Sequence, residues 1–152
     1  MSAVIVPAGA MTADTQSARD VLCLAGGTGL APVKAVVEAL IGATGSGRQR
    51  EIVLYHGARR RQDLYDLRAL RDMEKAYPWL QVIPAVSDEP TREDVMYGTV
   101  PELAAKADFA ERDIYISGPD HMIVKTARVL KERGAEDHLI HYDLDAEVAQ
   151  AV

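Results

Sequence analysis

Short apolar runs alternate along this chain with segments whose apolar residues recur at helical spacing. Runs with no polar face are typical of strands buried on both sides. They predict five strands, at residues 21–25, 51–57, 80–86, 113–117 and 138–142. Residues 4–6 could add an edge strand, whereas the polar stretch 87–97 predicts a long loop.

The segments between the strands carry apolar residues three or four positions apart, which places them on one face of a helix. Four helices are predicted, with apolar positions at Val33, Val36, Val37, Leu40 and Ile41; at Leu64, Leu67, Leu70 and Met73; at Val100, Leu103, Ala104 and Ala107; and at Met122, Ile123, Thr126, Val129 and Leu130. We expect Thr28 to cap the first helix, with Pro32 in its first turn, and Asp63 to cap the second. Gly134 is expected to end the last helix.

Strands that alternate with helices indicate an α/β fold with a parallel sheet. Right-handed crossovers then favour a three-layer, doubly wound, five-stranded sheet of order 3-2-1-4-5, with helices on both faces. In such a sheet the winding reverses between strands one and four. A ligand is therefore expected at the carboxyl ends of these two strands, and both ends carry glycine.

Composition narrows the class of protein. The 152 residues suit one domain, and we expect residues 1–19 to be a lead-in and residues 20–152 the folded domain. The net charge of -6 argues against nucleic-acid binding, and no apolar run is long enough to span a membrane. The single cysteine, Cys23, lies within a predicted strand, which excludes a disulfide framework and fits a cytoplasmic protein. The four scattered histidines do not favour a metal site.

The first strand ends in a glycine-rich corner, Gly26-Gly27-Thr28-Gly29, and a helix pattern starts at once. Glycine allows a tight turn and a close approach of the backbone to a ligand. The helix start points free N–H groups at the same place, which suits the phosphates of a dinucleotide. The run is not the G-x-G-x-x-G fingerprint, because Pro32 stands where the third glycine would be, and a turn without a ligand stays open.

The fourth strand ends in a second corner, Ser117-Gly118-Pro119, which repeats the same logic. Taken alone it could be a plain turn, but two such corners flanking the reversal point predict a dinucleotide site. The second strand is followed by Gly57, Ala58 and three arginines, Arg59 to Arg61, where the adenosine ribose lies in such folds. The arginines could hold a phosphate, or they could be a solvated charge run.

The corners together resemble a known family. Gly-Gly-Thr-Gly-Leu-Ala-Pro at 26–32, Gly-Ala-Arg at 57–59 with Asp-Leu-Tyr at 63–65, Val-Ser-Asp-Glu-Pro at 86–90 with Gly98 and Val100, and Ser-Gly-Pro-Asp-His-Met at 117–122 are similar to the NAD(P)-binding domain of the ferredoxin–NADP reductase superfamily. The similarity is strongest to the NADH-dependent reductases of bacterial oxygenases and flavohaemoglobins. It implies an oxidoreductase domain that presents a nicotinamide for hydride transfer to FAD.

The resemblance also implies roles for individual residues. The nucleotide would be held at Gly27, Thr28, Gly29, Leu30, Pro32, Gly57, Ala58, Arg59, Arg60, Ser87, Asp88, Gly118, Pro119 and Met122. Ser117 would stand beside the reacting nicotinamide carbon, at a position where many relatives have cysteine.

The residues favour one coenzyme over the other, NADH or NADPH, only by a narrow margin. Arg59 and Arg60 favour the 2′-phosphate of NADPH, but the carboxylate of Asp88 disfavours it, and the balance favours NADH.

The resemblance implies partners as well. The flavin of this superfamily lies on a separate β-barrel, and residues 7–11 resemble the last segment of that barrel. We therefore expect the lead-in to be a remnant of a linker or barrel end, and the chain alone to bind nucleotide without turnover. The electron acceptor would be a haem or iron–sulfur protein. A nucleotide-sensing module without flavin stays open, whereas a receiver-type domain is disfavoured because strand one ends in Ala25-Gly26 rather than in acids.

Overall fold

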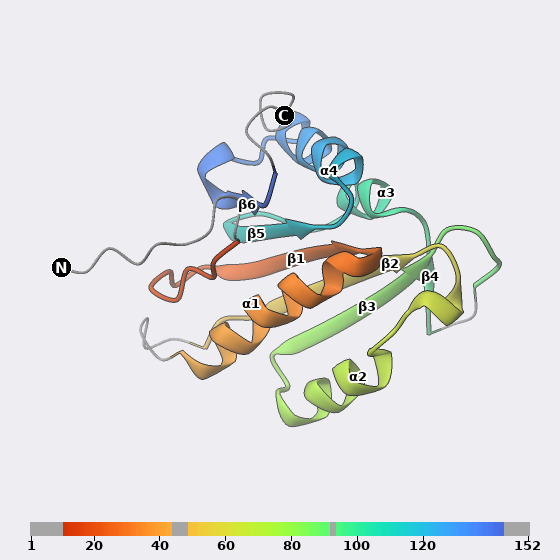
Figure 1. Cartoon of the computed structure of the whole chain (residues 1–152). Coiled ribbons are helices and arrows are strands. Elements are labelled where there is room, and N and C mark those ends of the chain that lie inside the picture. The colour runs from red at the N-terminus through yellow and green to blue at the C-terminus, as the bar shows by residue number, and fades with distance from the viewer. Residues whose placement is uncertain (1–10, 44–48, 92–93, 145–152) are drawn as a thin grey trace.

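A parallel sheet forms the centre of the computed structural model, which describes residues 11–43, 49–91 and 94–144 (Figure 1). The described residues contain six strands in the order β4-β3-β2-β1-β5-β6, and every neighbouring pair is parallel. The strands are β1 (Asp20–Gly26), β2 (Ile52–Ala58), β3 (Leu80–Val86), β4 (Met96–Tyr97), β5 (Arg112–Ser117) and β6 (Ile140–Tyr142).

The five expected strands and their relative order are confirmed, and the sheet has one more strand than expected. The additional strand, β4, lies inside the stretch that was predicted to be a loop. It holds two residues, both exposed, so it carries no buried alternation that the sequence could reveal. The expected edge strand at residues 4–6 lies outside the described residues, and β6 starts two residues later than predicted because 137–139 form a 3-10 turn, η3 (Asp137–Leu139).

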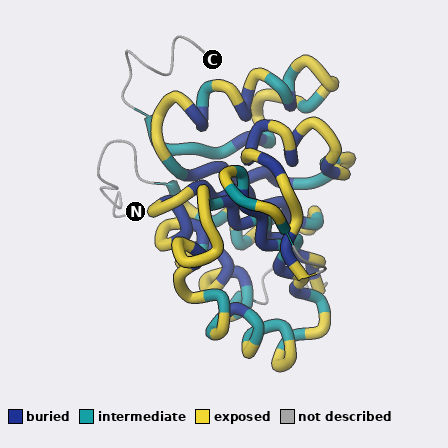
Figure 2. Tube along the Cα trace, turned by 90° about the vertical axis from the view of Figure 1, so that its right-hand side faces the viewer, coloured by how far each residue is buried: buried dark blue, intermediate teal, exposed yellow. Residues whose placement is uncertain are grey.

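Helices cover both faces of the sheet, as expected. Helices α1 (Leu30–Gly42) and α2 (Leu67–Ala76) pack on one face, and α3 (Val100–Ala104) and α4 (Asp120–Glu132) on the other (Figure 1). Alternate residues of β1 serve the two cores, since Cys23 faces α1 whereas Leu22 and Leu24 face α4. Figure 2 shows buried positions along the sheet and exposed ones on the outer turns of the helices.

Two of the predicted helix caps are wrong. Thr28 does not cap α1, because a 3-10 turn, η1 (Gly27–Gly29), follows β1 and the cap position falls on Gly29, with no side-chain hydrogen bond. Asp63 lies in another 3-10 turn, η2 (Arg61–Asp63), and α2 starts only after Asp66. Gly134 follows the end of α4 with a φ of +100°, as a helix stop requires.

At the amino edge of the sheet, a buried arginine ties the segment before β1 to the strands. Arg50 is 6% exposed, and its guanidinium bonds Asp113 Oδ2 at 2.7 Å, the Asp14 carbonyl at 2.7 Å and the Arg19 carbonyl. The Tyr115 hydroxyl accepts a hydrogen bond from the Asp14 amide at 2.8 Å. The described residues before β1 are therefore part of the packed domain.

The single cysteine lies in the middle of the sheet. Cys23 is fully buried in β1, and burial raises the pKa of its thiol to about 12.

Within the ranges that the structure describes, none of the helices has the length and apolar character needed to cross a bilayer.

Candidate nucleotide-binding site

The two glycine corners meet at the carboxyl edge of the sheet, at the point where the winding reverses. The parallel register places Ala25 opposite Ser117 and Gly26 opposite Gly57, so the ends of β5, β1 and β2 lie side by side. A Cβ added at Gly29 would lie 2.5 Å from the Gly118 nitrogen, and closer still to the Ser117 carbonyl. Both are backbone atoms, so this approach is open only to glycine.

Met122 and Gly118 tighten the same junction. A Cβ on Gly26 would overlap Met122 Sδ, and one on Gly118 would lie 3.0 Å from the Gly26 carbonyl oxygen. Gly118 has a φ of +153°, which side chains rarely allow. The two corners are therefore packed against each other, and they flank the reversal point as the sequence predicted.

A cleft of about 560 Å³ opens beside this junction. It is bounded by the carboxyl ends of β1, β2 and β3 and by the first turns of α3 and α4. Its lining residues are Gly26, Gly27, Gly57, Ala58, Arg59, Ser87, Gly98, Thr99, Val100, Pro101, Pro119, His121, Met122 and Lys125. The volume lies in the ordinary range for a small-molecule or cofactor site.

Both helices that begin at the junction have open N-termini. The first turns of α1 and α4 receive no hydrogen bond from a capping side chain. No capping side chain therefore competes with a ligand at these helix starts, and the helix dipoles favour negative charge there. An uncapped helix start behind a glycine turn suits a pyrophosphate, so the chain's residues fit a dinucleotide on geometry alone.

The predicted site residues divide into four groups. Those that line the cleft are Gly27, Gly57, Ala58, Arg59, Ser87, Pro119 and Met122. Gly29, Leu30, Ser117 and Gly118 form the junction behind it, and the side chain of Leu30 belongs to the core. Thr28 and Pro32 are exposed at the start of α1.

The remaining two predicted residues, Arg60 and Asp88, line a second hollow of about 240 Å³ together with Arg59, Gln62 and Asp63. Arg59 borders both spaces, so the hollow continues the cleft toward the end of β2. This is the place where the sequence predicted the adenosine ribose.

Acids from the β3–β4 connection neutralise the arginines at this end. Arg59 Nε lies 3.0 Å from Asp88 Oδ2, and Arg61 lies 2.7 Å from Asp94 Oδ2. Glu89 accepts a hydrogen bond from the Arg61 amide. The hydrogen bond from Arg61 lowers the pKa of Asp94. Two of the three arginines, Arg59 and Arg61, are therefore already paired with carboxylates.

Sequence reasoning missed the part of the cleft that α3 and α4 supply. Thr99 and Pro101 reach it because Thr99 caps α3 through a reciprocal pair of bonds with Glu102. His121 and Lys125 reach it from one face of α4, and their four-residue spacing was the available signal.

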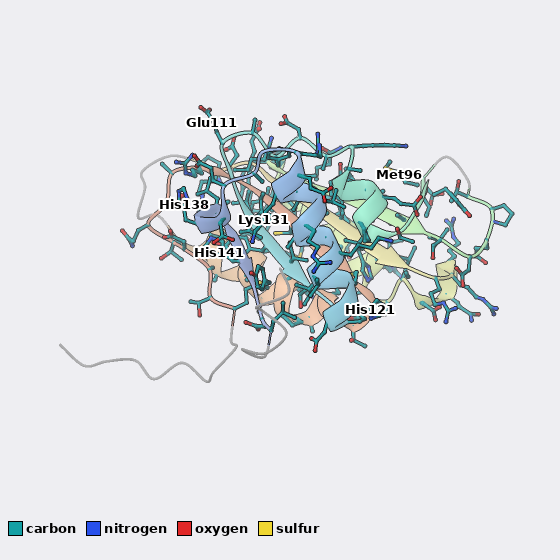
Figure 3. The ribbon with its side chains drawn as sticks, turned by 90° about the horizontal axis from the view of Figure 1, so that it is seen from above. Met96, Glu111, His121, Lys131, His138 and His141 are labelled. Carbon is teal, nitrogen blue, oxygen red and sulfur yellow. The ribbon has the colours of Figure 1, made fainter. Side chains whose placement is uncertain are left out.

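Figure 3 shows His121 far from His138 and His141. Within residues 11–43, 49–91 and 94–144, no group of metal-ligating side chains comes together.

Comparisons with known proteins agree with this geometry. The model of the oxidoreductase NAD-binding domain family matches residues 23–128. The chain is 34% identical over 124 residues to the ferredoxin–NAD(P)+ reductase component of the naphthalene 1,2-dioxygenase system of Pseudomonas putida, covering 80% of this chain and 37% of that protein. It is 30% identical over 132 residues to the reductase subunit of an aromatic O-demethylase of Amycolatopsis, covering 84% of this chain and 38% of that one.

Solved structures of similar proteins have the same fold. The Amycolatopsis cytochrome P450 reductase superposes with a TM-score of 0.73 at 26% identity, over 84% of this chain and 38% of that one. The FAD/NAD-binding domain of nitric oxide dioxygenase from Vibrio cholerae has a TM-score of 0.67 at 18% identity, over 85% of this chain and 52% of that one, which shows a shared fold. The chain thus spans well under half of the curated relatives it matches.

Proposed function

The chain belongs to the family of oxidoreductase NAD-binding domains, and from this premise we propose that its cleft presents the nicotinamide of NADH to a flavin held on a separate domain. The observation that carries the proposal is the fixed junction of Gly26 and Gly29 with Ser117 and Gly118. That junction leaves two uncapped helix starts beside one cleft.

We assign the pyrophosphate to the backbone of residues 27–30 and to the first turn of α1, where N–H groups and the helix dipole favour it. Gly118, Pro119 and Met122 would border the nicotinamide. Ser117, 8% exposed at the end of β5, would pack beside its reacting face. Gly57, Ala58 and Arg59 would carry the adenosine end.

The bound nicotinamide supplies the hydride, and the chain's own residues supply orientation. Val100, Pro101 and Met122 give the cleft an apolar wall that excludes water from the nicotinamide. The backbone junction fixes the direction in which the ligand lies. Holding two reactants in a reactive arrangement removes much of the entropic barrier to their meeting.

For the coenzyme we propose NADH rather than NADPH. A 2′-phosphate in the hollow beside Arg59 would meet the Asp88 carboxylate and compete with the ion pair already formed there. Arg61 is likewise engaged by Asp94. NADH brings no charge to this position and leaves both pairs intact.

The partners follow from the relatives, which include reductases of dioxygenase and P450 systems. We propose that the flavin lies on a β-barrel domain and passes electrons singly to an iron–sulfur or haem protein. The described surface keeps the cleft open at the carboxyl edge of the sheet, where such a domain can reach it.

Calorimetry with ADP-ribose, NADH and NADPH tests the binding part of the proposal. We expect ADP-ribose and NADH to bind and NADPH to bind more weakly. No heat from ADP-ribose at millimolar concentration would refute the proposal, and tighter binding of NADPH would refute the choice of coenzyme.

Fusion to a flavin barrel tests the redox part. We expect NADH to bleach the flavin of the fusion protein in an anaerobic stopped-flow measurement. A flavin that stays oxidised while the nucleotide binds would instead favour a nucleotide-sensing module.

A further inference from the structure

His56 is a buried polar residue beneath the glycine turn that the proposed binding mode does not use. It lies in β2 one position before Gly57 and is 0% exposed. In the described structure neither Nδ1 nor Nε2 of its ring makes a hydrogen bond. A buried polar atom left without a partner destabilises a fold, so packing alone does not account for a histidine at this position.

The ring lies on the α1 face of the sheet, because His56 follows Ile52 and Leu54 at alternate positions. Its strand neighbours, Ala25 of β1 and Pro84 of β3, are uncharged. The Tyr65 ring meets it edge to face, with centroids 5.6 Å apart.

Two charged residues accompany His56. Asp66, which precedes α2, favours the protonated ring, and Lys34 of α1 pairs with Asp66 at 3.4 Å. From η1, the backbone of Gly27 also favours the protonated ring. Burial outweighs both effects and lowers the pKa of His56, so the ring is neutral near pH 7.

Gly27 connects this ring to the cleft. It has a φ of +55°, which glycine adopts without strain, and it lines the cleft directly. The ring of His56 lies behind it, on the face opposite the cleft residues of α3 and α4. Negative charge placed on η1 would therefore act across a single turn of backbone on the His56 ring, which is itself enclosed where water screens charge poorly.

We infer that His56 is a positioning residue of the glycine turn, and that binding of a pyrophosphate there is linked to the uptake of one proton by its ring. This inference rests on the proposed nucleotide site. The proton comes from solvent and binds the free ring nitrogen, and no other bond forms or breaks. The imidazolium then offers an N–H to the Gly27 backbone and a positive charge beneath the phosphates.

His121 provides a rival explanation for any pH dependence, because it is exposed and lines the cleft. Matched variants distinguish the contributions of the two histidines to a pH dependence. His56→Phe keeps an aromatic ring of similar size without a titratable nitrogen, and His121→Gln removes the rival titration while keeping a polar side chain.

The experiment is calorimetry with ADP-ribose from about pH 8 to about pH 6, repeated in two buffers of different ionisation enthalpy. Affinity should rise about threefold to tenfold as the pH falls, since a difference of one pKa unit corresponds to a tenfold change. The buffer dependence should report proton uptake. His56→Phe should abolish both effects and His121→Gln should retain them.

A pH-independent affinity in the unaltered chain, an effect that survives His56→Phe, or an effect lost in His121→Gln would each overturn the inference. If the His56 variant does not fold, NMR chemical shifts of the imidazole nitrogens, measured on the unaltered chain as a function of pH, report the protonation of His56 directly. The variants His121→Gln, His138→Gln and His141→Gln assign the other three histidines. Saturation with ADP-ribose should raise the pKa of His56, and an unchanged value would refute the linkage.

The proposed function and this inference fail in different ways. If ADP-ribose does not bind at any pH, the nucleotide site itself is refuted. If it binds without proton uptake, only the role of His56 is refuted.

Discussion

The two edges of the sheet are built in opposite ways. At the amino edge, long side chains bond one another, and Arg50 alone contacts Asp113 and two carbonyl groups from the segment before β1. At the carboxyl edge, glycines let the backbones of the two corners approach each other and the Met122 side chain. One edge satisfies its polar groups internally, and the other leaves helix N-termini open.

The contrast indicates a division of labour. A buried guanidinium whose three nitrogens each donate to the protein holds the folded state together and is not available to a ligand. Open N–H groups beside a cleft contribute little to stability and are available for binding. Substitutions at the two edges should therefore separate stability from nucleotide affinity.

The largest effect is expected at the amino edge. Arg50→Met leaves the Asp113 carboxylate buried without its partner, which should lower the free energy of unfolding by about 3–5 kcal/mol. Urea denaturation measures the loss, and Arg68→Met on the exposed face of α2 is the matched control. ADP-ribose affinity of the folded fraction should stay unchanged, so a large loss of affinity would break the contrast.

Gly29→Ala should have the converse effect at the carboxyl edge. The added methyl group meets the backbone of Ser117 and Gly118, so the junction must open. We expect ADP-ribose affinity to fall at least about tenfold, with a loss of stability of about 1–3 kcal/mol. Gly42→Ala, at the end of α1 with open space around it, is the control and should retain affinity. Wild-type binding by Gly29→Ala would show that the junction is not needed.

Acid should weaken the amino edge through Asp113. Burial raises the pKa of this carboxyl, but the neighbouring His141 and Ser17 side chains and the charge of Arg50 outweigh it, and the net pKa is lowered. Its contribution is therefore present above the unfolded pKa of about 3.9 and is lost as the pH falls through the folded value. Unfolding free energies measured below about pH 4 should fall less steeply for Asp113→Asn than for the unaltered chain. Equal slopes for the two proteins would show that Asp113 does not contribute to the loss of stability in acid.

The smallest expected effect concerns the coenzyme. Asp88→Asn removes a negative charge from the hollow and frees Arg59. NADPH affinity should rise about twofold to fivefold relative to NADH, in keeping with the small free energy of an exposed ion pair. Competition titrations measure the ratio, and Asp72→Asn on α2 is the control. A ratio that does not change would place the 2′-position elsewhere.

Much of the fold could be predicted because parallel strands buried on both faces appear as apolar runs. The sequence located β3 to the residue, and the two cores follow from alternate positions of β1. Strand β4 could not be found this way, because its pairing with β3 depends on where the chain returns and not on its own residues. The cap at Thr28 failed because the glycine turn continues as a 3-10 turn before α1 begins.

The site could be predicted where backbone geometry defines it and not where packing does. Gly27, Gly57 and Gly118 could be predicted because glycine marks tight turns and close approaches of the backbone in any sequence. Thr99 and Lys125 line the same cleft only because α3 packs against α4, a contact that local patterns do not encode. The sequence did not single out His56 for the same reason. Only the three-dimensional structure shows that its ring nitrogens are buried without a hydrogen-bond partner.

The enclosed thiol of Cys23 has a practical consequence. A sulfur that stays protonated in the middle of a sheet does not react with maleimides, and the chain has no second cysteine. A fluorophore attached to Lys125→Cys would therefore label the rim of the cleft alone. Its emission would report the arrival of ligands and partner domains in real time, without a background dye to subtract.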